Sequence, residues 1–265
     1  MMLDVNHVYK TFHPGTINER RALAGVDLHL EEGDFVTVIG GNGAGKSTLL
    51  NAVAGVWPVD GGSIVIDGND ITGLPDYKRA PFIGRVFQDP MMGTAPDMQL
   101  EENLALAYRR GKKLGLRWHI NREERDMYRE RLRELNLGLE DRLTTKVGLL
   151  SGGQRQAVTL LMASLQKPRL LLLDEHTAAL DPATAAKVLE LSDRIVQENG
   201  LTTMMITHNM KDAIRHGNRL IMMNKGEIIF DCRGDEKAKL TVEDLLEKFA
   251  QISGSTLDND RALLG

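Results

Sequence analysis

One stretch of the sequence decides the fold: Gly40-Gly41-Asn42-Gly43-Ala44-Gly45-Lys46-Ser47-Thr48, which lies between a strand pattern and a helix pattern. The apolar residues 35–39 before it predict a buried strand, and residues 49–54 after it predict a helix that Gly55 ends. Its glycines allow turns without a Cβ clash, so successive backbone N–H groups can point into one concavity. The helix N-terminus adds unpaired N–H donors and a partial positive charge. The stretch therefore predicts a phosphate-binding loop.

Two side chains of this loop have the chemistry to act on a nucleotide. Lys46 would reach the β- and γ-phosphates, and the Ser47 hydroxyl would bind Mg2+. The alternative is a glycine-rich loop with a chance Gly-Lys-Ser sequence, and the flanking strand and helix argue against it. By itself the motif indicates only that the chain binds ATP or GTP.

The composition is that of a globular chain of 265 residues with a formal net charge of −4. This length suits one large domain or two small ones, and the nearly balanced charge gives no reason to expect a nucleic-acid partner. Cys232 is the one cysteine, which excludes an intramolecular disulfide and favours a reducing compartment. The N-terminal sequence lacks a basic segment followed by an apolar run, so we expect no signal peptide. The apolar runs are much shorter than the roughly 20 residues of a membrane span, so another chain would have to supply any spanning part.

The other patterns predict an α/β fold. Residues 3–35 carry short alternating apolar segments, which are typical of half-exposed antiparallel strands. Residues 82–87, 170–174 and 203–207 predict further strands. Residues 91–150 instead predict a mostly helical insert, which interrupts the sheet.

The insert contains a clear helix start and a basic loop. Asn121 predicts an N-cap, with Glu124 reaching back to it, and Gly138 is predicted to end that helix. The loop before it could contact anionic lipid or an acidic partner, but a solvated loop is favoured because the whole chain is not basic. Its cations are Arg109, Arg110, Lys112, Lys113 and Arg117.

A second glycine-rich helix start follows the insert, as Leu150-Ser151-Gly152-Gly153-Gln154. Ser151 is placed to cap the amphipathic helix that follows, and the helix N-terminus is a second candidate phosphate site. A simple capped turn would explain the serine and one glycine. It would not explain both glycines followed by Gln154.

Polar residues end several predicted strands. Asp174 and Glu175 follow an apolar strand, and two acids there suggest Mg2+ coordination and activation of a water, whereas a strand that merely meets solvent needs one charge. Gln88 and His208 end two other strands and could contact the ligand, although such a histidine more often has a structural role. Asp181 is predicted to cap the next helix.

Together and in this order, these motifs resemble the ATP-binding subunit of ABC transporters, over residues 3 to about 250. The nine residues from Gly40 match the Walker A loop of that family, Gln88 its Q-loop, and residues 150–154 its signature motif residue for residue. Residues 170–174 resemble Walker B. Further matches are Glu175 at the catalytic glutamate, Asp181 at the D-loop aspartate, His208 at the switch histidine and Phe12 at the adenine-stacking aromatic. Phe12 matches the family position better than Tyr9 for stacking on the adenine ring. For either residue, ordinary core packing is the alternative.

The resemblance implies a P-loop NTPase of RecA-like fold with ATP and Mg2+ as cofactors. Two copies would close on two ATP molecules, each held between the Walker A loop of one copy and Ser151, Gly152, Gly153 and Gln154 of the other. It implies Ser47, Gln88 and Asp174 as metal ligands, and Lys46, Glu175 and His208 as catalytic residues. The implied partners are an integral-membrane permease and an extracellular or periplasmic substrate-binding protein, with the chain peripheral at the cytoplasmic face of the membrane.

The resemblance also implies a domain plan. We expect a single ATP-binding domain over residues 1–265, with a core that includes the antiparallel part over residues 1–88 and 155–250, a helical subdomain over 89–154 and a tail over 251–265.

One departure concerns the residue after the glutamate, where His176 replaces the usual proline of the family. The histidine is similar to importer ATPases linked to amino-acid-type binding proteins, sometimes for tryptophan or tyrosine, and the chain is therefore expected to power import of a small solute such as an amino acid. An exporter subunit is the main alternative. A DNA-repair ATPase is disfavoured because there is no room for a coiled coil between Gln88 and Ser151, and a translation ATPase because only one cassette is present.

Overall fold

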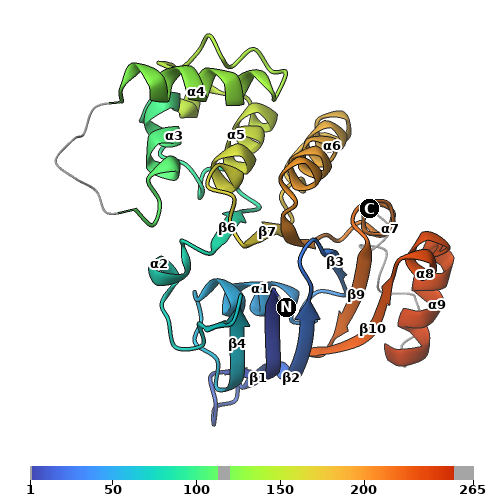
Figure 1. Cartoon of the computed structure of the whole chain (residues 1–265). Helices are drawn as coiled ribbons and strands as arrows, with labels where there is room; N and C mark the ends of the chain where they lie inside the picture. Colours follow the sequence, from blue (N-terminus) through green and yellow to red (C-terminus); the bar gives the residue numbers. More distant parts are fainter. Residues whose placement is uncertain (1, 113–119, 254–265) are drawn as a thin grey trace. The chain divides into compact units, whose positions relative to one another are not determined.

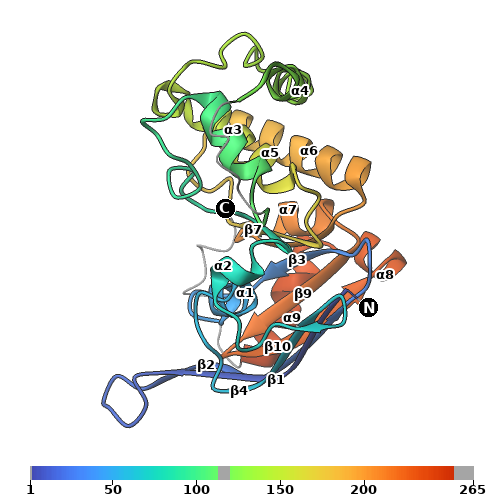
Figure 2. The ribbon, with the colours of Figure 1, turned by 60° about the vertical axis from the view of Figure 1, so that its left-hand side comes forward.

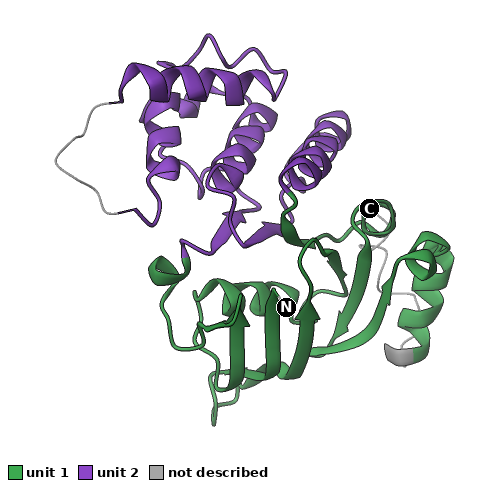
Figure 3. Ribbon diagram, viewed as in Figure 1, with its two compact units in different colours: residues 1–79, 200–265 green, residues 80–199 purple. Residues whose placement is uncertain are grey.

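The computed structural model describes residues 2–112 and 120–253, and their chain path is drawn in Figure 1. The chain divides into two compact units (Figure 3), unit 1 with residues 1–79 and 200–265 and unit 2 with residues 80–199. The predicted α/β class and antiparallel N-terminal part are confirmed. The finer domain plan, with a helical subdomain over residues 89–154, stays a prediction.

Unit 1 contains an antiparallel sheet in the order β2-β1-β4-β5, and Figure 2 shows β1, β2 and β4 side by side. Its strands are β1 (Leu3–Phe12), β2 (Arg20–Leu30), β4 (Gly61–Ile66) and β5 (Asn69–Asp70). In β1 the buried residues Leu3, Val5 and Val8 are followed by more exposed positions, as the alternating apolar pattern predicts for a sheet with one covered face. The short helix α2 (Asp76–Arg79) ends this part of the unit.

Unit 1 also contains strands in the order β10-β9-β3-β8. They are β3 (Phe35–Ile39), β8 (Thr202–Ile206), β9 (Arg219–Asn224) and β10 (Glu227–Arg233). Strand β3 pairs in parallel with both β8 and β9, and all five of its residues are buried, as its unbroken apolar run predicts. Around this sheet lie α1 (Lys46–Ala54), α7 (Met210–Arg215), α8 (Asp235–Ala238) and α9 (Val242–Ser253). Leu245 and Phe249 of α9 join a buried cluster with Ile39 of β3.

Unit 2 combines a parallel strand pair with a group of helices. Its elements are β6 (Ile83–Val86), α3 (Leu100–Tyr108), α4 (Arg122–Arg133), the 3-10 turn η1 (Val147–Leu149), α5 (Gly152–Ser164), β7 (Leu170–Asp174) and α6 (Pro182–Asn199). Strands β6 and β7 pair in parallel, so their carboxyl ends lie at the same edge of the pair. Helices α3, α4 and α5 contact one another, with Tyr128 and Leu132 of α4 fully buried.

Helix α4 begins as predicted but ends earlier than predicted. Asn121 and Glu124 form the capping box, with the Glu124 N–H donating to Asn121 Oδ1 over 2.8 Å. The helix ends at Arg133 and not near Gly138, because Asn136 adopts a left-handed conformation with φ 56° that breaks the helical turn. Asparagine tolerates this conformation better than most residues.

The basic loop after α3 is partly described. Arg109 pairs with Glu124 at 3.0 Å, and the Nη2 atom of Arg110 donates to the Ala163 carbonyl over 3.1 Å. The Lys112 ammonium lies 3.8 Å from the centre of the Tyr108 ring. These three cations contact their own chain, which favours the structural interpretation of this part of the loop. Lys113 and Arg117 lie outside the described residues.

Candidate functional site

The phosphate loop leaves no room for side chains at two of its glycines. Gly40 has φ 147°, and a Cβ atom there would lie 2.2 Å from the Met223 carbonyl oxygen. Gly45 has φ 108°, and its Cβ would lie 2.6 Å from the Ala22 carbonyl oxygen. Both positions therefore require glycine, for close backbone approach as well as for φ. Backbone carbonyl groups of β9 and β2 therefore lie directly against the phosphate loop at Gly40 and Gly45.

Lys46 folds back over the loop as the first residue of α1. Its Nζ atom donates to the carbonyl oxygens of Gly40 at 2.7 Å and Gly41 at 3.2 Å, and the residue is only 7% exposed. Ser47 follows with an exposed side chain. Among the described side chains, none caps this helix at Gly45. A helix N-terminus with a lysine held beside it has the chemistry to hold phosphate oxygens.

Arg20 is a neighbour of the loop that the sequence patterns did not reveal. The Arg20 Nη2 atom donates to the Gly43 carbonyl oxygen over 3.1 Å, and the side chain comes from β2, more than twenty residues earlier. Arg20 is the exposed first residue of β2, and the sequence around it gives no sign of a contact with Gly43. The arginine places one further positive charge beside the phosphate loop.

Phe12 lies at the end of β1 and is partly exposed. Its ring packs edge-to-face against Trp57 with the ring centres 4.9 Å apart, and the Lys10 ammonium lies 5.7 Å from its centre. The alternative aromatic, Tyr9, instead lies under the guanidinium of Arg21 at 5.3 Å. A partly exposed ring supported by Trp57 suits adenine stacking, which stays a prediction for Phe12.

His208 is the remaining predicted site residue of unit 1. It follows β8 and is partly buried. The next residue, Asn209, caps α7, because its Oδ1 atom accepts from the N–H groups of Lys211 at 2.9 Å and Asp212 at 3.2 Å. This cap fixes the turn that carries the histidine.

In unit 2, the signature residues form the N-terminus of α5. Ser151 and Gln154 make a capping box: the Gln154 N–H donates to Ser151 Oγ at 3.3 Å and the Ser151 N–H donates to Gln154 Oε1 at 3.2 Å. A Cβ atom on Gly153 would lie 2.3 Å from the Thr184 side chain of α6, so this glycine has a packing role. Ser151 and Gly152 remain exposed. The capping box gives Ser151 and Gln154 a structural role, and the close contact with Thr184 gives Gly153 one, which the sequence pattern alone did not indicate. Ser151 and Gly152 are exposed and so are available to a ligand.

Asp174 and Gln88 lie at the same edge of the parallel pair in unit 2. Asp174 ends β7 and Gln88 follows β6 with an exposed side chain. Asp174 pairs with Arg85 of β6, whose Nη2 atom is 3.1 Å from the aspartate Oδ2 atom. Burial lowers the pKa of Arg85, and the charge of Asp174 partly opposes that shift. The arginine also stacks 4.5 Å from the centre of the Phe87 ring, which is the residue before Gln88. The sequence patterns did not reveal Arg85, because its partner is 89 residues away in the sequence.

Glu175 and Asp181 bound the turn between β7 and α6. Glu175 has φ 45°, an unusual conformation for a residue with a side chain of this size. Asp181 caps α6 by accepting from the Thr184 N–H at 3.1 Å, as predicted. Hydrogen bonds from the Thr184 side chain and backbone lower the pKa of Asp181.

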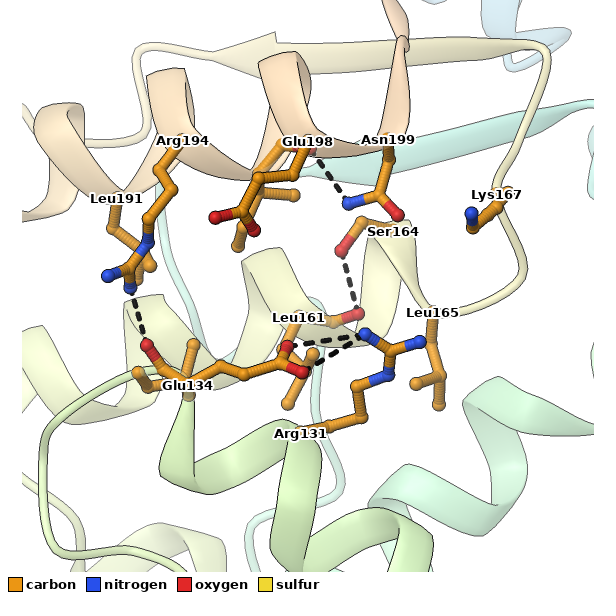
Figure 4. Close-up of a pocket in the computed structure, with 12 residues that line it drawn as sticks. Arg131, Glu134, Leu161, Ser164, Leu165, Lys167, Leu191, Arg194, Glu198 and Asn199 are labelled. Carbon is orange, nitrogen blue, oxygen red and sulfur yellow. Dashed lines mark hydrogen bonds and ion pairs between the residues drawn. The ribbon is translucent and has the colours of Figure 1, made fainter.

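The described residues of unit 2 line a groove and a smaller pocket. A groove of about 650 Å³ has the signature residues Ser151, Gly153 and Gln154 on one side and Thr184 and Lys187 of α6 on another. A smaller pocket, drawn in Figure 4, lies among α4, α5 and α6, and its lining among the described residues includes none of the predicted site residues. The pocket is lined by both cationic and anionic side chains (Figure 4): Arg131, Lys167 and Arg194, with Glu134 and Glu198. Arg131 donates to the Glu134 carboxylate at 3.2 Å.

The predicted site residues are thus divided between the two units. Unit 1 carries Phe12, the phosphate loop and His208, and unit 2 carries Gln88, the signature residues, Asp174, Glu175 and Asp181. Within residues 2–112 and 120–253, no helix has both the length and the hydrophobicity needed to cross a bilayer.

Comparisons with known proteins agree with this set of motifs. A family model described as ABC transporter matches residues 23–178. The chain is 47% identical to the tyrosine transport ATP-binding protein of Clostridioides difficile (strain R20291), over 94% of this chain and 98% of that protein. It is 33% identical to a xylose/arabinose import ATP-binding protein of Sulfolobus acidocaldarius, over 94% and 95% of the two chains.

Solved structures show the same likeness. A dimeric ATP-binding cassette in a post-hydrolysis state with ADP and phosphate aligns with a TM-score of 0.75 at 31% identity, covering 88% of this chain and 98% of that one. The fold prediction, a P-loop NTPase with an antiparallel β part, is thereby confirmed. The chain belongs to the ABC transporter family, as an ATP-binding subunit that hydrolyses ATP.

Proposed function

We propose that this chain powers the import of a small solute, of the amino-acid type, through a separate membrane permease. The observation that carries the proposal is the 47% identity to a tyrosine transport ATP-binding protein over nearly the full length of both chains. Several other relatives are also import ATP-binding proteins, named for sugars, sulfonates and polyamines. The full-length match to the first relative favours tyrosine or a similar aromatic amino acid.

Within this proposal, the residues have distinct roles in phosphoryl transfer. Lys46 and the N–H groups of the phosphate loop neutralise the β- and γ-phosphates, and Phe12 stacks on the adenine. Glu175 orients and polarises the attacking water, and His208 contacts the γ-phosphate. Catalysis of this kind depends mainly on positioning and charge neutralisation.

The donor set fits Mg2+, which prefers oxygen ligands and usually binds together with substrate phosphates. The Ser47 hydroxyl, the Gln88 amide oxygen and the Asp174 carboxylate would supply such oxygens, and Ser47 and Gln88 have exposed side chains. Mg2+ would neutralise charge on the phosphates. The ion pair with Arg85 fixes the orientation of the Asp174 carboxylate.

We further propose that two copies act together, each ATP lying between the phosphate loop of one copy and the signature residues of the other. The exposed Ser151 and Gly152 at the start of a 13-residue helix support this, because that N-terminus can face the γ-phosphate. The similar cassette solved as a dimer with ADP and phosphate also supports it. The assembly would lie at the cytoplasmic face of the membrane, with the permease and an external solute-binding protein.

The test is purification of the chain with the permease that it binds, followed by ATPase and transport assays in liposomes. Lys46→Ala should abolish hydrolysis and uptake, whereas Lys239→Ala, which removes an exposed lysine of unit 1, should leave both unchanged. Uptake that requires ATP inside and tyrosine outside supports the proposal. Outward transport would identify an exporter, and ATPase activity of Lys46→Ala within a few fold of wild type would contradict the site.

A further inference from the structure

His176 is a buried histidine next to the proposed catalytic glutamate. It is 2% exposed, and its Nε2 atom lies 3.0 Å from the Oγ atom of Ser192. Ser192 is 1% exposed and belongs to the buried face of α6. The ring therefore joins the turn after β7 to a helix residue 16 positions further along the chain.

The direction of this hydrogen bond follows from the proton inventory. Ser192 donates its single hydroxyl proton to the Val188 carbonyl oxygen, over 2.8 Å. With that proton used, the Ser192 oxygen accepts from His176 in the tautomer that carries its proton on Nε2. A leucine at position 176 could not make this bond, and neither could the proline that is usual in the family.

The bond joins the start of the turn that carries Glu175 to the middle of α6, the helix that follows the turn. Glu175 has φ 45°, and its carbonyl oxygen accepts from the Ala178 N–H at 3.0 Å. At the far end, Asp181 caps α6 through Thr184. A residue in a sparsely populated backbone conformation persists only when its surroundings hold it. His176 is the residue next to Glu175, and its side chain is anchored on α6.

We propose that His176 is a positioning residue for ATP hydrolysis: through Ser192 it anchors the turn that aims the Glu175 carboxylate. The inference rests on the proposed role of Glu175 as the residue that polarises water. A general base acts only within hydrogen-bond reach of its proton, so a small displacement of the turn lowers turnover without affecting nucleotide binding at the phosphate loop.

The test uses the 265-residue chain, five single variants and one double variant. Ser192→Ala removes only the accepting oxygen, His176→Leu removes the donor, and His176→Gln keeps an amide N–H donor of similar reach. Ser164→Ala is the matched control, because Ser164 is also a buried helix serine of unit 2, bonded to the Leu160 carbonyl at 2.9 Å. For each variant, kcat, KM and the Kd for a fluorescent ATP analogue are measured, together with the melting temperature.

Ser192→Ala and His176→Leu should each lower kcat roughly tenfold, with the Kd for the analogue changed by less than about twofold. His176→Gln should recover most of the loss. The double variant Ser192→Ala/His176→Leu should be no worse than the worse single variant, because both remove the same bond.

Unchanged kcat in Ser192→Ala, or an equal loss in Ser164→Ala, would overturn the inference. Ser192→Ala also decides the matter if His176→Leu fails to fold, since it deletes one atom. Glu175→Gln tests the role of the glutamate separately from that of His176. If Glu175→Gln keeps full turnover, the proposed role of Glu175 fails. If Glu175→Gln is inactive while Ser192→Ala is fully active, only the role of His176 fails.

Discussion

The guanidinium of Arg85 and the carboxylate of Asp174 form an ion pair across two parallel strands, with Nη2 and Oδ2 3.1 Å apart. Both side chains are largely buried, at 14% and 16% exposure. The pair links the strand that leads to Gln88 with the strand that ends at the predicted metal ligand. Two predicted site residues of unit 2 therefore share one structural support.

Removal of this arginine should destabilise the chain. Arg85→Met leaves the Asp174 carboxylate largely buried without its partner, which costs about 1–3 kcal/mol of unfolding free energy. Arg133→Met is the matched control, because Arg133 pairs with Glu130 on the exposed surface of α4, where a pair contributes below about 1 kcal/mol. Urea unfolding followed by circular dichroism measures the difference. Equal unfolding midpoints for the two variants would contradict a structural role of Arg85.

A second prediction concerns Arg79, which is 2% exposed and holds the end of α1. Its guanidinium donates to four carbonyl oxygens, those of Ala52 and Val53 at 2.8 Å, Leu74 at 2.7 Å and Thr72 at 3.0 Å. Burial lowers its pKa, and the charges of Asp70 and Asp76 partly oppose this.

Arg79→Lys keeps the charge but cannot reach four acceptors with one ammonium group, so it should lower the unfolding free energy by about 3 kcal/mol. Arg133→Lys, at an exposed position, should change it by less than about 1 kcal/mol. Thermal melting compares the two, and a melting temperature of Arg79→Lys equal to that of wild type would show that the four bonds are dispensable.

The third prediction compares two glycines of unit 1 that share a positive φ but differ in the space available for a side chain. Gly45 and Gly68 both have positive φ, at 108° and 73°. A Cβ atom at Gly45 would lie 2.6 Å from a carbonyl oxygen, whereas a Cβ atom at Gly68 would enter open space. Gly68→Ala should cost about 1–2 kcal/mol of stability and leave ATP binding intact. Gly45→Ala should displace the phosphate loop and weaken ATP binding more than about tenfold. Titration with a fluorescent ATP analogue tests this, and equal affinities for the two variants would contradict the loop geometry.

Local signals in the sequence predicted much of the fold correctly. The capping box at Asn121, the caps at Ser151 and Asp181 and the buried strand before Gly40 depend on residues a few positions apart, so the pattern shows them directly. The sequence places the end of α4 too late, because Asn136 already adopts a left-handed conformation two residues before Gly138, and the local pattern does not show which of the two ends the helix.

Contacts between distant residues were not predictable in the same way. Arg85 and Arg79 have ordinary sequence neighbourhoods, and they bond to residues of other elements. His176 departs from the family pattern at the residue after Glu175, but its bond to Ser192 depends on how α6 packs. The residues predicted to act on ATP follow from motifs, while the contacts that support them follow only from tertiary structure.

We propose that the phosphate loop of one copy and the signature residues of another act on the same ATP, and mixed dimers test this arrangement most directly. Lys46→Ala removes the phosphate clamp, and Ser151→Arg places bulk and charge at the helix N-terminus that should face the γ-phosphate. Each variant should be inactive alone. In a mixed dimer one site carries both changes, and the other joins an intact phosphate loop to an intact signature.

The decisive measurement is the amount of ATP occluded by purified, differently tagged Lys46→Ala and Ser151→Arg heterodimers. The control is a dimer of wild type with a single chain that carries both changes, where each site has one defect. We predict that the heterodimer occludes about one ATP per dimer, because one of its two sites is intact, and that the control occludes almost none. Occlusion by the heterodimer no greater than that of either parent homodimer would contradict the shared site.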